Sequence, residues 1–194
     1  MAESAFRLKG KKAVVTGGDQ GMGQAIAIRL ANEGCDVVID FRTNQAGAEG
    51  TKKRVKAAGR RGVTIQADVG QSGEIQRLLD GSFEILGPVD FLVNNAGSEK
   101  NANFLDVTEH DYQAVIAVNL TAPFFLSQLF VQKLKAAGKS GKIVNISSVH
   151  EELPFPHFAP YCMAKGGLKM MMRTLATELA PVGITINKHR SRSN

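Results

Sequence analysis

Short apolar segments that alternate with helical stretches constrain the fold of this chain more than any other feature. Continuous runs of Val and Ile are typical of strands that are buried on both faces of a parallel sheet. Between these runs lie helical periods, as in Met22, Ile26 and Leu30, which recur every four residues. Repeated β-α-β units predict an α/β fold with a doubly wound parallel sheet of the Rossmann type. The expected strands cover residues 12–16, 36–40, 62–66, 89–93, 141–147 and 183–187.

The carboxyl ends of these expected strands carry small or polar residues rather than ordinary turn sequences. In an open parallel sheet the carboxyl ends lie along one edge, and ligands bind there. The residues that fall at this edge are Thr16, Gly17, Asp40, Phe41, Arg42, Asp68, Val69, Asn94, Asn95, Ala96, Gly97, Ser147, Ser148 and Asn187. Candidate functional residues are therefore expected among them.

The segment "VVTGGDQGMGQAI", residues 14–26, joins the first expected strand directly to a helix. Its glycines Gly17, Gly21 and Gly23 are spaced G-x-x-x-G-x-G, which differs from the common G-x-G-x-x-G dinucleotide fingerprint. Backbone N–H groups and the helix N-terminus in such a loop can face an anionic ligand. The alternative is a turn whose glycines only allow tight packing.

A second motif, "YCMAK", places Tyr161 and Lys165 one helical turn apart, so that both side chains project on one side. An ammonium close to a phenol stabilises the phenolate, which predicts a lowered pKa for Tyr161. A tyrosine tuned in this way can exchange a proton with a carbonyl or alcohol oxygen. Ser148 lies thirteen residues earlier and can donate a hydrogen bond to the same oxygen. Alone, the Tyr/Lys spacing also fits an exposed pair of helix neighbours.

Composition and charge limit the classes of partner that this chain is expected to bind. The net charge of +6 is spread along the chain, and its densest run, residues 52–61, has the pattern of the polar face of a surface helix, so no nucleic acid partner is expected. Cys35 and Cys162 form no metal-ligand pattern, and we expect no metal and a reducing compartment. No apolar run approaches the ~18 residues of a membrane helix. The first residues lack an apolar signal core, so a cytoplasmic protein without membrane contact is expected.

Five motifs, in order and at matching spacing, resemble those of the short-chain dehydrogenase/reductase family between about residues 8 and 187. They are T-G-x-x-x-G-x-G, N-N-A-G, a helix asparagine, a serine and Y-x-x-x-K, matched in turn by Thr16, Gly17, Gly21 and Gly23, by residues 94–97, by Asn119, by Ser148, and by Tyr161 and Lys165. The resemblance implies that residues 1–187 form a dinucleotide-binding catalytic domain. It also implies that the glycine loop holds a pyrophosphate.

The resemblance further implies roles for these residues. Tyr161 would be the general acid/base, Ser148 would hold the substrate oxygen, and Lys165 would tune Tyr161 and bond the nicotinamide ribose. Asn119 would organise a water that links Lys165 to solvent. Besides Tyr161 and Lys165, the cofactor would contact Gly17, Gln20, Gly21, Met22, Gly23, Arg42, Asp68, Val69, Asn95, Ala96 and Gly97. The substrate would contact Ser148, His150 and Tyr161.

The cofactor choice depends on the end of the second expected strand, "VVIDFRTN". A carboxylate there bonds the ribose hydroxyls of NAD, whereas an arginine favours the 2′-phosphate of NADP. Asp40 falls one place before the family's usual NAD-selecting acid, and Phe41 occupies that place. Arg42 sits where members preferring NADP often carry a base. We therefore expect NADP, with NAD as the alternative and Asp40 as a plain strand-end residue.

Within the family, the stretch from Ser147 to Met171 is most similar to glucose 1-dehydrogenase-like members, and next to the 3-oxoacyl-carrier-protein reductase type. The implied activity is hydride transfer between NADP(H) and a carbonyl compound or secondary alcohol, including glucose or a related sugar. His150, Glu151 and Glu99 are candidates to bond sugar hydroxyls, or are solvated loop residues. Relatives commonly pair through helices at about residues 104–136 and 161–180, which implies a homodimer or homotetramer.

The sequence departs from the family after "GITIN". The family continues there with a Pro-Gly segment and substrate-covering helices, whereas this chain continues "KHRSRSN". We expect residues 188–194 to form a basic disordered tail and the sheet to stop at its sixth strand. That strand would then be an uncovered edge beside exposed apolar surface. A truncated or frame-shifted enzyme, a short isoform and an incomplete chain all fit, and the alternative function is a catalytically impaired dinucleotide-binding or oligomerising module.

Overall fold

A computed structural model of the chain describes residues 6–191. Within this range six strands form one sheet in the order β3-β2-β1-β4-β5-β6, and every neighbouring pair is parallel. The strands are β1 (Lys12–Val15), β2 (Asp36–Phe41), β3 (Gly62–Gln66), β4 (Phe91–Asn94), β5 (Gly141–Ser148) and β6 (Ile184–Ser191). The predicted α/β fold with a doubly wound, Rossmann-type sheet is confirmed.

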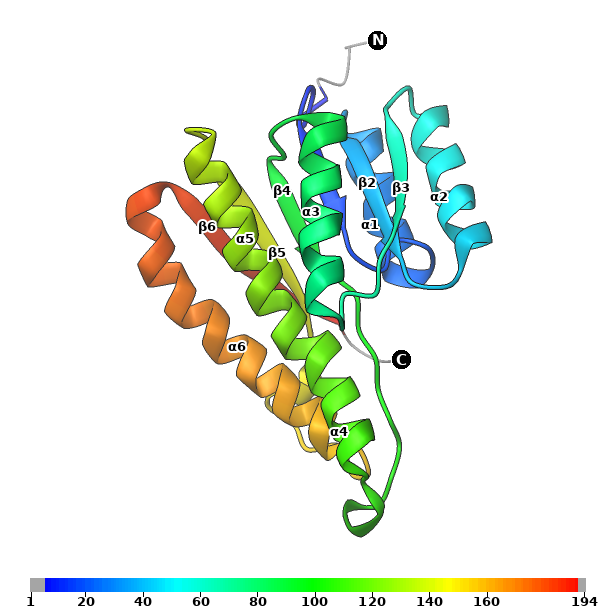
Figure 1. Cartoon of the computed structure of the whole chain (residues 1–194), viewed down its shortest axis with the longest axis vertical. Coiled ribbons are helices and arrows are strands. Elements are labelled where there is room, and N and C mark those ends of the chain that lie inside the picture. The colour runs from blue at the N-terminus through cyan, green and yellow to red at the C-terminus, as the bar shows by residue number, and fades with distance from the viewer. Residues whose placement is uncertain (1–5, 192–194) are drawn as a thin grey trace.

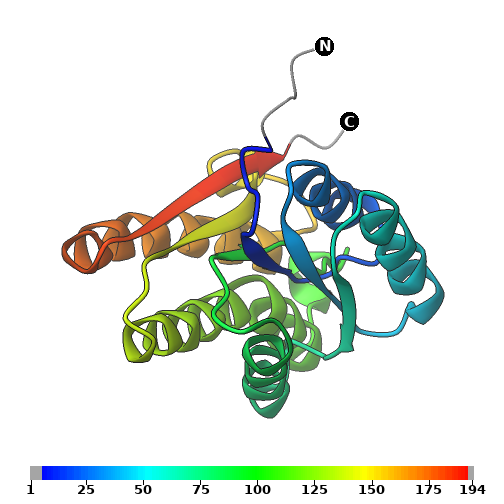
Figure 2. The same ribbon diagram turned by 90° about the horizontal axis from the view of Figure 1, so that it is seen from above.

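Helices cover both faces of the sheet (Figures 1 and 2). On one face lie α1 (Gly21–Asn32) and α2 (Gln45–Ala57), and on the other lie α3 (Ser72–Leu86), α5 (Ala122–Ala136) and α6 (Ala159–Leu179). A short helix, α4 (Glu109–Ile116), continues through a π-helical turn, η2 (Ala117–Thr121), into α5. The 3₁₀ turns are η1 (Phe104–Asp106), η3 (Val149–Glu151) and η4 (Ala180–Val182).

Side-chain alternation along the strands builds one core on each face. Val14 and Leu92 point to the α3, α5 and α6 side, where Phe130 is the largest fully buried side chain. Val15 and Ile39 point to the α1 and α2 side. Because the strands contribute to both cores, they carry the continuous apolar runs seen in the sequence.

Local signals also end and begin the helices as the sequence suggests. The Thr108 side chain accepts a hydrogen bond from the Asp111 N–H (3.1 Å) at the start of α4, as in a capping box. Gly34, which follows α1, has φ +96°, a left-handed conformation that favours glycine. These local features fix where the chain turns back towards the sheet.

Among the described residues, the segment Glu109–Ala136, from α4 to α5, is long and apolar enough to cross a membrane by length and composition alone. The expectation of no membrane helix rested on uninterrupted apolar runs, whereas polar residues interrupt this segment. Core helices of soluble folds meet the same criterion, and one side of this helix packs on the sheet and on α3. Its outer side leaves apolar residues exposed, among them Phe124 and Phe125.

The sixth strand differs from expectation. Residues 188–191, predicted to be disordered, continue β6 and pair with β5 in the register Lys188↔Asn145 to Ser191↔Ser148, while residues 192–194 lie outside the described part. Composition gave the wrong answer because strand pairing uses backbone groups, which any side chain leaves available. β6 is an edge strand, as expected, but its open face is polar, because Ile184 and Ile186 point inward and Thr185 and Asn187 outward.

Candidate active site

The glycine loop between β1 and α1 is shaped by close backbone contacts. Gly17 and Gly21 have φ values of +60° and +53°. A Cβ on Gly23 would lie 2.1 Å from the Gly17 carbonyl oxygen, and one on Gly17 would lie 3.1 Å from the Ala96 Cα. Larger residues therefore cannot replace Gly17 and Gly23 without moving the loop.

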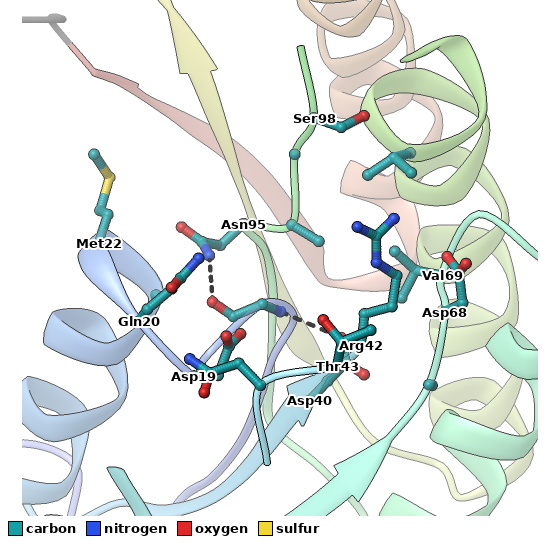
Figure 3. Close-up of a pocket in the computed structure, with 17 residues that line it drawn as sticks. Asp19, Gln20, Met22, Asp40, Arg42, Thr43, Asp68, Val69, Asn95 and Ser98 are labelled. Atoms are coloured by element: carbon teal, nitrogen blue, oxygen red, sulfur yellow. Dashed lines mark hydrogen bonds between the residues drawn. The ribbon is translucent and has the colours of Figure 1, made fainter. Parts of the chain in front are cut away.

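The loop from β4 fastens this glycine loop at the centre of the sheet. The Asn95 side-chain amide donates to the carbonyl oxygens of Thr16 (2.9 Å) and Gly17 (3.0 Å), and the latter bond is visible in Figure 3. In return the Thr16 hydroxyl accepts from the backbone N–H groups of Asn95 (2.9 Å) and Ala96 (3.0 Å). The N-N-A-G motif thus fixes the glycine loop through hydrogen bonds to Thr16 and Gly17.

A hollow of about 290 Å³ opens along this edge of the sheet, at the carboxyl ends of β1 to β4 (Figure 3). Of the cofactor contacts expected in the loops, all but Gly21 line it: Gly17, Gln20, Met22, Gly23, Arg42, Asp68, Val69, Asn95, Ala96 and Gly97. Residues that the sequence did not single out as contacts also line it, namely Asp19, Asp40, Thr43, Asn44, Ala67, Ser98 and Val118. Gly21 contributes its left-handed backbone instead.

Asp40 lies under the glycine loop rather than at the rim of the hollow. Its side chain is buried, Oδ2 accepts a hydrogen bond from the Gly17 N–H (3.2 Å), and Oδ1 has no partner. Burial raises the pKa of Asp40 to about 8, which the Gly17 N–H partly opposes and the charges of Asp19 and Asp68 reinforce. Asp40 is thus more than a plain strand-end residue, because it anchors the loop.

Phe41, the last residue of β2, and Arg42, which follows it, point in opposite directions. Phe41, at the place of the family's NAD-selecting acid, is buried in the α1 and α2 core. Arg42 is exposed and extends into the hollow near Val69 (Figure 3). A cationic side chain therefore borders the groove, and no carboxylate takes the place of Phe41.

A second hollow, of about 380 Å³, continues the first towards α6. The two share Met22, Asn95, Gly97 and Ser98. The second is lined in addition by Glu99, Asn119, Ile146, Ser147, Tyr161, Lys165 and Ser191. Three of the four predicted catalytic residues, Asn119, Tyr161 and Lys165, thus line a hollow that continues the groove of the glycine loop.

Lys165 and Tyr161 lie together at the amino end of α6. The Lys165 ammonium is 5.4 Å from the centre of the Tyr161 ring and donates to the Ile146 carbonyl oxygen (3.1 Å). Burial lowers the pKa of Lys165 to about 8, an effect that the charge of Glu151 partly opposes. The pKa of Tyr161 is raised, because burial and Glu99 outweigh a hydrogen-bonding contact with Ser148. The net lowering expected for the pKa of Tyr161 is therefore wrong for this structure.

Asn119 occupies the π-helical turn η2, an irregularity common at functional sites. Its side-chain amide donates to the carbonyl oxygens of Ser98 (2.6 Å) and Val115 (2.9 Å). Its Oδ1 is buried without a partner and lies against Gly97, where a Cβ would be 3.2 Å away. An acceptor is thus held at the side of the hollow, as a residue that organises a water requires.

The side chains of Ser148 and His150 have different surroundings. Ser148 ends β5, is buried, and accepts a hydrogen bond from the His150 N–H (3.2 Å) while contacting Tyr161. The His150 ring stacks on Phe155 (4.2 Å between centroids), which stacks in turn on Phe158 (4.2 Å). Neither Ser148 nor His150 is among the residues that line the second hollow.

Glu151 cannot bond a sugar hydroxyl, contrary to one reading of the sequence. Its side chain is fully buried, accepts a hydrogen bond from the Ser147 hydroxyl (2.7 Å) and forms an ion pair with Lys188. Burial acts to raise the pKa of Glu151, but Lys188 and Ser147 outweigh it and leave that pKa low. Glu99 does line the second hollow. In the described residues, no group of three or more His, Cys, Asp or Glu side chains is arranged to hold a metal ion.

The edge fits a dinucleotide on three counts. The backbone at Gly17 and Gly23 packs too closely for a Cβ, so the loop carries no side chain there; buried polar atoms of Asp40, Ser98 and Asn119 in this region have no partner, and Arg42 supplies a cation. A loop followed by a helix N-terminus suits a pyrophosphate. We therefore take both hollows as one cofactor and substrate site.

Comparison with known proteins agrees with this geometry. Residues 11–190 match the family model described as short chain dehydrogenase. 3beta-Hydroxysteroid dehydrogenase 1 of Eggerthella lenta is 39% identical over 180 residues, which cover 93% of this chain and 69% of that protein. Glucose 1-dehydrogenase 2 of Bacillus subtilis is 38% identical over 181 residues, with 93% and 70% covered.

Solved structures are similar over nearly the whole chain. A dehydrogenase/reductase from Sinorhizobium meliloti superposes with a TM-score of 0.91 at 35% identity, covering 98% of this chain and 75% of that one. A short chain dehydrogenase from Burkholderia cenocepacia, solved in complex with NADP, superposes with a TM-score of 0.89 at 35% identity, with 94% and 74% covered.

The contacts of Gly23 lead to a first testable prediction. We expect Gly23→Ala to weaken NADPH binding by at least about tenfold, because the new methyl must displace the Gly17 carbonyl and reshape the anion cradle. Titration of NADPH fluorescence measures the affinity. Gly73→Ala is the matched control, since a Cβ there meets nothing within 4 Å. Equal affinities for parent and Gly23→Ala would contradict the assignment of the loop.

Proposed function

This chain belongs to the short-chain dehydrogenase family of NAD(P)-dependent oxidoreductases, and from that premise we propose that it transfers a hydride between NADP(H) and a carbonyl compound or secondary alcohol in the second hollow. The observation that carries the proposal is the meeting of Tyr161, Lys165 and Asn119 in the hollow that continues the glycine-loop groove. When bound, the dinucleotide supplies or accepts the hydride.

In the proposed reaction, side chains of the protein supply the proton that the substrate oxygen takes up. Burial keeps the Tyr161 phenol neutral near neutral pH, so that it can donate its proton to a carbonyl oxygen as negative charge develops there. Ser148, in contact with Tyr161, is proposed to hold the same oxygen. Lys165, as an ammonium over the ring, stabilises the phenolate that remains. Carbonyl reduction is the direction that a neutral phenol favours.

The remaining roles are proposed as follows. The cofactor-binding residues are those of the glycine loop and of the strand ends that line the first hollow, with Arg42 towards the 2′-phosphate. Similarity to glucose 1-dehydrogenase 2 supports a sugar substrate, with Glu99 as the carboxylate available in the hollow. A cytoplasmic location is supported by Cys35 and Cys162, which are free thiols as in a reducing compartment.

The first test of this function uses the two tyrosines of the chain. We expect NADPH-dependent reduction of a carbonyl panel, and oxidation of glucose and of a 3β-hydroxysteroid with NADP, to fall by about 10²- to 10⁴-fold in Tyr161→Phe, because the proton donor is lost. Tyr112→Phe, which changes the only other tyrosine, is the control and should retain activity. Absorbance of the reduced nicotinamide measures both. Cofactor binding without turnover in the parent chain would favour the binding-module alternative.

The second test concerns the cofactor. We expect Arg42→Gln to weaken NADPH binding by about tenfold and to leave NADH binding unchanged, because the charge-assisted bond to the 2′-phosphate is lost. Arg60→Gln is the control, since Arg60 pairs with Asp36 at the opposite end of β2. Dissociation constants for both nucleotides give the ratio. A parallel loss for NADH and NADPH would remove Arg42 from the selection of the phosphate.

Self-association is the second part of the proposal. A groove of about 850 Å³ lies between α5 and α6, and its walls include Phe124, Phe125 and Met170, whose exposed fractions are 41%, 45% and 58%. Exposed apolar surface of this kind is typical of an interface between protein chains. We propose that two copies of the chain pair through this α5/α6 face.

We expect sedimentation at micromolar concentration to show a dimer or tetramer, and the double variant Phe125→Asp/Met170→Asp to shift the protein to smaller species, because buried charges oppose the contact. Ile85→Asp is the control, since Ile85 is 41% exposed on α3, away from this groove. A parent protein that sediments only as a monomer would contradict the proposal.

A further inference from the structure

The part of β6 that was expected to be disordered reaches the back of the catalytic corner. The Ser191 hydroxyl donates to the Ser147 carbonyl oxygen (2.8 Å), and Lys188 forms an ion pair with Glu151. The Ser147 hydroxyl in turn donates to Glu151 (2.7 Å). Two residues of β6 thus hold the turn that follows Ser148.

This turn lies directly beside Lys165. Glu151 belongs to η3, which packs on α6, and the Lys165 ammonium bonds the carbonyl oxygen of Ile146, the residue before Ser147. Ser147, Ser191 and Lys165 line the same hollow. A carboxylate with a fully buried side chain therefore belongs to the turn that packs on the helix of Lys165.

We propose that Glu151 and Lys188 are positioning residues for the reaction, an ion pair with a buried carboxylate that holds the Ser147 corner against α6 and controls the charge on Lys165. The inference rests on the proposed function for its catalytic meaning, but the pair and its effect on Lys165 can be measured without turnover. It concerns residues outside the motifs that carried the family resemblance.

Glu151 brings one charge close to Lys165, and Lys188 brings the opposite charge into contact with Glu151. Glu151 is the one charged group found to raise the pKa of Lys165 against the effect of burial. Lys188 partly cancels it, because the two charges are in contact. Removing the Glu151 charge should therefore lower the pKa of Lys165, and removing the Lys188 charge should raise it.

The other ionisable groups that face this region interact with partners other than Lys165. Glu99 acts on Tyr161, and Glu152 is held by Lys169 in an exposed ion pair (2.7 Å). His150 is stacked on Phe155. Arg190 acts on Glu152 rather than on Lys165. The Glu152–Lys169 pair therefore offers a matched control on the same two elements.

The experiment is an NMR titration of the protein carrying ¹³Cε-labelled lysine, with the Lys165 signal assigned through Lys165→Arg. We expect Glu151→Gln to lower the Lys165 midpoint by about one pH unit, Lys188→Met to raise it, and Glu152→Gln to leave it unchanged. The basic limb of the pH profile for carbonyl reduction should move with the midpoint. Midpoints that do not move, or that move in the same direction in both single variants, would overturn the inference.

A double variant protects the test against misfolding. Glu151→Gln/Lys188→Met leaves no buried charge without its counter-ion, so it should fold even where a single variant does not. Its Lys165 midpoint should lie between those of the single variants, and a midpoint above or below both would overturn the inference. Opposite shifts of the Lys165 midpoint in a protein that shows no turnover would reject the proposed function but not the role of the pair. Turnover with unchanged Lys165 midpoints would reject the role of the pair but not the proposed function.

Discussion

The pairing of β1 with β4 is the constraint on which the rest of the site depends. Strand order reverses there, so the loops that leave these two strands diverge and leave a groove between them. Thr16 and Asn95 close the base of that groove with reciprocal hydrogen bonds between the two loops. The glycine loop can remain open to an anion because its neighbour, rather than its own side chains, holds it in place.

Much of this could be predicted from the sequence. The Val and Ile runs gave the sheet, and the residue types at the strand ends gave the edge that carries the site, because both follow from local patterns. The spacing of Tyr161 and Lys165 correctly placed them together, since one helical turn fixes the distance between them. The resemblance to a family then supplied roles that no spacing alone contains.

The failures share a physical cause, namely contacts between segments far apart in the chain. Residues 188–191 are polar and charged, yet they form a strand because the free edge of β5 offers backbone partners. Glu151 is expected from the sequence either to bond a sugar hydroxyl or to be a solvated loop residue, but Lys188, distant in sequence, holds it inside. The pKa of Tyr161 was expected to follow its nearest cation, whereas burial has the larger effect. None of these effects produces a periodic pattern in the sequence from which it could be predicted.

The buried ionisable groups along the edge determine which protonation states are available to the proposed proton transfer. With the pKa of Lys165 near 8 and that of Tyr161 raised above its ordinary value, the lysine loses its proton while the phenol still holds its own. In the proposed reaction, the upper pH limit for carbonyl reduction would therefore be set by the lysine rather than by the acid that gives the proton. In the same proposal, Glu151 would widen that pH range and Lys188 would narrow it, so an ion pair between β6 and η3 would set the pH at which the reaction stops.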